Sequence, residues 1–113
     1  MAASFTVTIR RRGKVEKSSY DALGAALDAL EAETRVAANT QVPRVERALG
    51  REYEPAAQVA VRGEVRGPGG VAGGIDVRGD GSAQAFTGRF RRQPVDAGER
   101  EDAWRALRRA IAA

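Results

Sequence analysis

Residues 58–92 have the sequence QVAVRGEVRGPGGVAGGIDVRGDGSAQAFTGRFRR, in which three alternating segments are separated by two glycine-rich breaks. Apolar and polar residues alternate in each segment, over residues 58–66, 71–78 and 83–92. The break at 79–82 is typical of a hairpin turn, because Gly and Asp tolerate positive φ. The stretch therefore predicts three consecutive antiparallel strands. In the last of them, Phe86 and Phe90 are expected to point into the core, and Arg89 and Arg91 outward.

The same alternation occurs upstream of this stretch. Residues 4–10 predict a strand, and Arg12-Gly13 predicts a turn from which residues 14–17 return as a short second strand. Ser18 is a candidate helix N-cap with Asp21 three residues later, and leucines at helical spacing follow. A helix is therefore expected from this cap to about Ala37.

Two further helices are predicted. Residues 41–50 have helical spacing of Val42, Val45 and Leu49, which indicates a short helix. Residues 99–112 carry an apolar stripe that includes Trp104, so a final helix should bury this tryptophan. Together these elements predict an α+β fold: an antiparallel sheet of four to five strands with two main helices on one face and the other face open.

Composition limits the function classes. The 113 residues are expected to form a single domain, residues 1–113, with no His and no Cys. The usual transition-metal ligands, thiol nucleophiles and imidazole bases are therefore missing, which favours a non-enzyme without metal or cofactor. The sequence offers three carboxylates, Glu54, Glu64 and Asp76, that could act as acid and base if a deep pocket brought them together, which is its least favoured interpretation. No signal peptide or membrane-length apolar run is visible, so we expect a cytoplasmic protein without a membrane partner.

The charge is basic and carried almost entirely by Arg. The formal net charge is +4, and only Lys14 and Lys17 among the 19 basic residues are Lys. A GC-rich bacterial genome would also produce this Arg bias, whereas the functional interpretation is phosphate binding. Strand alternation predicts an arginine-bearing open face, diluted by Glu64 and Asp76 and without aromatic residues, that consists of Arg10, Arg12, Arg62, Arg66, Arg78, Arg89 and Arg91.

The second candidate surface is the N-terminal hairpin, with its cluster of Arg10, Arg11, Arg12 and Lys14. Both surfaces suit a phosphate backbone or an acidic protein. The simpler interpretation is a solvated face of weak cross-strand ion pairs and a solvated hairpin tip. The sequence thus favours a small non-catalytic binding module, with nucleic acid as the leading partner. The alternative is a protein–protein adaptor or homo-oligomer that pairs through exposed strand edges.

Overall fold

The central strands form where alternation predicts them. In a computed structural model that describes residues 4–40 and 59–112, β3 spans Val59–Gly67, β4 spans Val71–Arg78 and β5 spans Ala83–Thr87. The connecting turns use glycines at positive φ, which residues with a Cβ rarely adopt: Gly69, Gly70 and Gly81. Each strand pairs antiparallel with the next.

The N-terminal hairpin is confirmed and is longer than predicted. β1 (Phe5–Arg11) pairs with β2 (Lys14–Tyr20) around a turn in which Gly13 has a φ of 65°. The expected N-cap at Ser18 is wrong, because Ser18 continues β2 opposite Val7. Tyr20 likewise pairs with Phe5, so strand pairing wins over the local capping signal.

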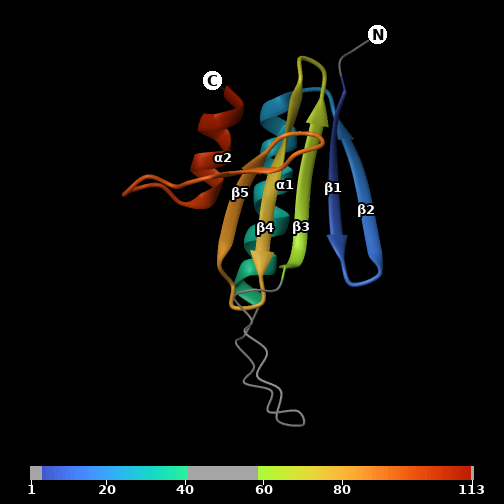
Figure 1. Ribbon diagram of the computed structural model, residues 1–113. Helices are drawn as coiled ribbons and strands as arrows, with labels where there is room; N and C mark the ends of the chain where they lie inside the picture. The colour runs from blue at the N-terminus through green and yellow to red at the C-terminus, as the bar shows by residue number, and fades with distance from the viewer. Residues whose placement is uncertain (1–3, 41–58, 113) are drawn as a thin grey trace.

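The sheet has six strands in the order β2-β1-β3-β4-β5-β6. Figure 1 shows β2, β1, β3, β4 and β5 side by side. β1 pairs antiparallel with β3, so the hairpin extends one side of the central sheet. The sixth strand, β6 (Gln93–Val95), was not expected, since Pro94 predicted a loop. Pro is tolerated there because β6 is an edge strand, whose outer groups need no ladder partner.

Both main helices lie on one face of the sheet, as predicted (Figure 1). α1 spans Leu23–Thr40 and α2 spans Ala103–Ala112. Gly63 allows α1 to approach closely, since a Cβ there would overlap Leu30 and come within 2.8 Å of Thr34 Cγ2. The core between the layers is built mainly from small aliphatic residues: Val7, Ile9, Ala26, Leu27, Leu30, Ala37, Val61, Val65, Ile75, Val77, Ala85, Trp104, Ala106 and Leu107.

The helix boundaries differ from the prediction. α1 begins later and ends later than expected, and α2 begins at Ala103 rather than near residue 99. Asp102 is the N-cap of α2, because its Oδ1 accepts the Arg105 backbone N–H at 2.9 Å. That hydrogen bond, followed by the Arg35 guanidinium, holds the pKa of Asp102 below its usual value. The predicted short helix 41–50 lies outside the described residues.

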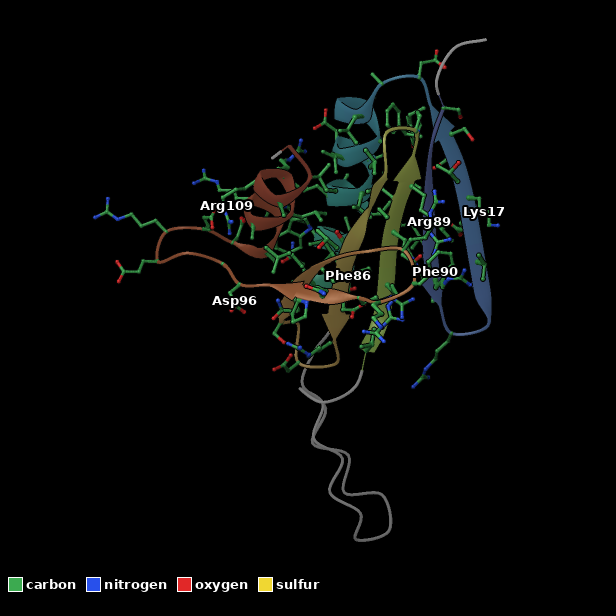
Figure 2. All side chains as sticks on the ribbon, turned by 45° about the horizontal axis from the view of Figure 1, so that its top comes forward. Lys17, Phe86, Arg89, Phe90, Asp96 and Arg109 are labelled. Atoms are coloured by element: carbon green, nitrogen blue, oxygen red, sulfur yellow. The ribbon has the colours of Figure 1, made fainter. Side chains whose placement is uncertain are left out.

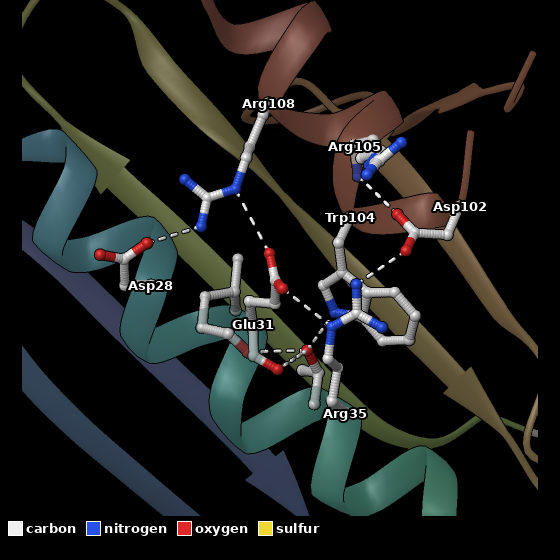
Figure 3. Close-up of polar contacts among 9 residues, drawn as sticks. Asp28, Glu31, Arg35, Asp102, Trp104, Arg105 and Arg108 are labelled. Carbon is white, nitrogen blue, oxygen red and sulfur yellow. Dashed lines mark hydrogen bonds and ion pairs between the residues drawn. The ribbon is translucent and has the colours of Figure 1, made fainter. Parts of the chain in front are cut away.

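The two helices are joined by a polar network around Trp104 (Figure 3). The Trp104 Nε1–H donates to Thr34 Oγ1 at 2.7 Å, and the Thr34 hydroxyl donates to the Leu30 carbonyl at 2.7 Å. Arg35 lies over the Trp104 ring, with its Cζ 4.1 Å from the centroid, and it also binds Asp102 at 2.7 Å. The predicted burial of Trp104 is confirmed, since its side chain belongs to the core and is 9% exposed.

The strand predicted over 83–92 is interrupted. β5 ends at Thr87, and Gly88 adopts a φ of 108° that turns the chain out of the strand. A loop over 88–92 follows before β6. The expected inward orientation of both phenylalanines is wrong. Phe86 is buried, but on the face opposite the helices, and Phe90 is 94% exposed. Among the described helices, none is long and apolar enough to cross a bilayer.

Candidate nucleic-acid interface

The sheet face opposite the helices carries the candidate site. Pairing places one cross-strand row on this face, running from β2 to β6: Lys17, Thr8, Glu64, Gly74, Phe86 and Pro94. The neighbouring row brings Arg10, Arg62 and Asp76 together. Arg66 and Arg78 lie on the same face by alternation. We call this surface, together with loop 88–92, the arginine face.

Loop 88–92 does not continue β5 but folds back over the central strands of the sheet (Figures 1 and 2). Three contacts tie it to β3 and β4. The Gly88 N–H donates to the Ala72 carbonyl at 3.0 Å, Arg66 Nη2 donates to the Arg89 carbonyl at 3.5 Å, and Arg92 Nη2 donates to Glu64 Oε1 at 3.2 Å. A Cβ at Gly88 would overlap the Arg91 carbonyl oxygen, so the tight start of the loop needs glycine.

Glu64 lies at the centre of the face and holds three arginines. Its side chain is only 8% exposed, and Arg92, Arg66 and Arg10 lie 3.2, 3.6 and 3.9 Å from its carboxylate oxygens. These arginines come from β1, β3 and the loop. Each is about half exposed, so one carboxylate gathers three guanidinium groups that still face solvent. The cluster has a formal charge of +2.

Arg62 does not belong to this cluster, because it forms a two-point ion pair with Asp76. Its Nε and Nη2 bind both oxygens of Asp76, at 2.5 and 3.2 Å. The hydrogen bond to Asp76 raises the pKa of the Arg62 guanidinium. Arg62 and Arg92 also lie over the Phe86 ring, at 5.8 and 5.5 Å from its centroid. Phe86 thus occupies the space that a side chain at position 74 would need, and its ring contacts both guanidinium groups.

Positive charge is concentrated on the arginine face. The arginine face carries eight basic side chains against Glu64 and Asp76, an excess of six: Arg10, Lys17, Arg62, Arg66, Arg78, Arg89, Arg91 and Arg92. Since the whole chain is +4, all other residues together carry a formal charge of −2. On the helices, by contrast, Arg35, Arg108 and Arg109 each bind a carboxylate.

Several face residues have no such partner. Within residues 4–40 and 59–112, no carboxylate lies within ion-pair distance of Lys17, Arg78, Arg89 or Arg91. The simpler interpretation of the sequence, a surface of cross-strand pairs, therefore describes Arg62–Asp76 and Arg10–Glu64 but not the whole face. A surplus of positive charge remains available to an anionic ligand.

The hairpin residues are only partly brought to this surface. Arg10 belongs to the arginine face, whereas Arg11 binds Glu33 of α1 at 2.7 Å. Arg12 lies in the turn rather than on a strand, and Lys14 begins β2. Strand alternation therefore does not apply to Arg12, because the ladder of β1 and β2 ends at Arg11 and Lys14, and its place on the face stays a prediction. The hairpin cluster is therefore divided: Arg10 lies on the arginine face, Arg11 lies beside α1, and Arg12 and Lys14 lie at the turn.

Four residues of the face were missed from the sequence: Lys17, Phe86, Phe90 and Arg92. Arg92 and Lys17 were not assigned to it, and the exposed aromatic Phe90 was expected in the core. The expected absence of aromatics is wrong, since Phe86 lies on the face and Phe90 at the end of the loop above it (Figure 2). Gly88 was the residue that could have indicated the end of the strand, because a glycine inside an alternating run often marks a bulge or a bend.

The carboxylates considered for acid–base chemistry do not line a cavity in the described part of the chain. A hollow of about 230 Å³ lies between β2 and α1, and a second of about 470 Å³ lies beside Gly69 and Ile111. Neither contains Glu64 or Asp76, whose oxygens bind arginines. Glu54, the third carboxylate considered, lies outside the described residues.

Strand β2 provides the exposed edge predicted for a protein–protein contact. It is the outermost strand on its side of the sheet, and Lys14 to Ser19 are all exposed. Its charges oppose pairing with a second copy, because edge lysines such as Lys14 and Lys17 are a common protection against strand addition. Comparison with known proteins gives no further guide to the ligand: no protein-family model, curated protein or solved structure matches this chain.

Proposed function

We propose that this protein is a small non-catalytic module that binds nucleic acid through the arginine face. The observation that carries the proposal is the excess of six positive charges on one sheet face and on the loop 88–92 that crosses it, where Glu64 gathers Arg10, Arg66 and Arg92 without neutralising them. Guanidinium groups spaced over several strands suit a chain of phosphates better than a single anion. The alternative, an adaptor that pairs through β2, is disfavoured by the lysines on that edge.

The affinity should fall steeply with salt. If the six excess charges of the face each neutralise a phosphate, log Kobs against log salt should have a slope of about −4 on single strands and about −5 on duplexes. Fluorescence anisotropy with labelled mixed-sequence DNA and RNA, from about 50 to 200 mM salt, measures this slope. No binding at the lowest salt, or a slope near zero, would contradict the proposal.

Charge variants locate the binding surface. Arg66→Gln should weaken binding and reduce the slope by about 1, whereas Glu64→Gln should strengthen binding and steepen the slope. Arg105→Gln is the matched control, because Arg105 is exposed on α2 and no carboxylate of the described residues pairs with it. Equal losses for Arg66→Gln and Arg105→Gln would show that binding follows overall charge and not this face. Circular dichroism checks that each variant is folded.

A further inference from the structure

Phe90 is the most exposed large apolar residue among the described residues, and it lies at the arginine face. Its side chain is 94% exposed, compared with 45–58% for Val15, Val36 and Val59. The loop that carries it is tied down on both sides, by the carbonyl of Arg89 and the guanidinium of Arg92. Phe90 therefore extends from a held loop and does not contribute to the core.

The neighbours of Phe90 are positively charged. Arg89 precedes it, Arg91 and Arg92 follow it, and Arg66 binds the carbonyl of Arg89. An aromatic ring beside guanidinium groups matches one nucleotide unit, whose base offers a π-face next to its phosphate. Only unpaired bases can offer that face, because the bases of a duplex are already stacked on one another.

We infer that Phe90 stacks on an unpaired base while Arg66 and Arg92 bind the neighbouring phosphates, so that the arginine face selects single-stranded over double-stranded nucleic acid. This inference rests on the proposed function and specifies its ligand. A membrane surface fits less well, because Phe86, the other phenylalanine of the face, is buried, and β3 presents Arg62 and Arg66 beneath the loop.

Substitutions at Phe90 separate stacking from hydrophobic contact. Phe90→Ala and Phe90→Leu should each weaken binding to a mixed-sequence single strand by about 5- to 150-fold, whereas Phe90→Tyr should bind like the wild type. Binding to the duplex of the same sequence should be unchanged in all three variants. Because Phe90 is almost fully exposed, the melting temperature should also be unchanged.

A strand of abasic phosphodiester units provides a second readout. The wild type should bind it no better than Phe90→Ala does, since neither complex contains a stacked base. Phe90→Leu should bind the strand with bases more weakly than the wild type does, and it should bind the abasic strand as well as the wild type does. The inference is overturned if Phe90→Ala binds single strands as tightly as the wild type, or if it loses duplex affinity equally.

Failure of the inference is distinguishable from failure of the proposed function. If binding depends on salt but is the same in the wild type and in Phe90→Ala, the proposed function stands and the stacking role of Phe90 is contradicted. Absence of nucleic-acid binding by the wild type removes both. Phe90-dependent binding to anionic phospholipid vesicles, without binding to single strands, would assign the loop to a membrane surface and overturn the inference.

Discussion

Trp104→Ala is expected to lower the free energy of unfolding by about 3–5 kcal/mol. Trp104 is 9% exposed and packs between α1 and the sheet, so its removal leaves a cavity that neighbouring aliphatic residues cannot fill. It also removes the donor to Thr34 and the ring beneath Arg35. Since small domains are stable by about 5–15 kcal/mol, this loss threatens folding itself.

Urea unfolding followed by circular dichroism measures the loss, because Trp104 is the only tryptophan and its fluorescence disappears in the variant. Trp104→Phe is the control. It keeps an aromatic ring and removes the indole N–H, while the Thr34 hydroxyl still donates to Leu30, so it should cost less than Trp104→Ala. A loss below about 1 kcal/mol for Trp104→Ala would show that the contact between the helices is peripheral.

Gly74→Ala is expected to destabilise the protein by about 1–3 kcal/mol or more. A Cβ at this position would overlap the carbonyl oxygen of Gly63, and it would lie 2.8 Å from Phe86 Cζ and 3.0 Å from Glu64 Cα. Two of these atoms belong to the backbone of β3, so the overlap with the new Cβ is removed only if β3 and β4 move apart. The same movement would displace Phe86 and Glu64, which support the arginine face.

Gly24→Ala is the matched control for this change. Nothing lies within 4 Å of a Cβ at Gly24, which is exposed in the first turn of α1. The substitution should therefore stabilise the protein by up to about 0.5 kcal/mol, less than in the middle of a helix, because alanine favours the helix. Scanning calorimetry should show the two melting temperatures moving in opposite directions. A Gly74→Ala protein that melts at or above the wild-type temperature would contradict the close packing at β3 and β4.

The fold class was predictable because alternation and helical spacing are local signals. Val61, Val65, Ile75 and Val77 identify the buried face of β3 and β4 without reference to the rest of the chain. Strand order was not predictable, since the pairing of β1 with β3 depends on contacts distant in sequence. The end of β2 was missed because Ser18 and Asp21 satisfy a capping pattern that strand pairing with β1 overrides.

The candidate site was predicted in outline. Alternation placed Arg10, Arg62 and Arg66 on one face, and their pairing confirms that they lie together. The two phenylalanines were placed wrongly for a physical reason. α2 brings Trp104 and Leu107 to the sheet, so β5 presents the small Ala85 beneath it, and Phe86 occupies the other face above Gly74. The alternation of residues 89–92 predicted a buried Phe90, whereas the chain leaves the strand at Gly88, the one residue in the sequence that indicated the change.

The central claim is that the arginine face, and no other surface, contacts nucleic acid. Amide chemical shifts of the labelled protein, recorded while a short single strand is added, test it most directly. The predicted changes fall on the face and its loop, at Thr8, Glu64, Gly74 and residues 88–92. Changes confined to the hairpin turn around Arg12 or to α2, with the face unaffected, would contradict the claim.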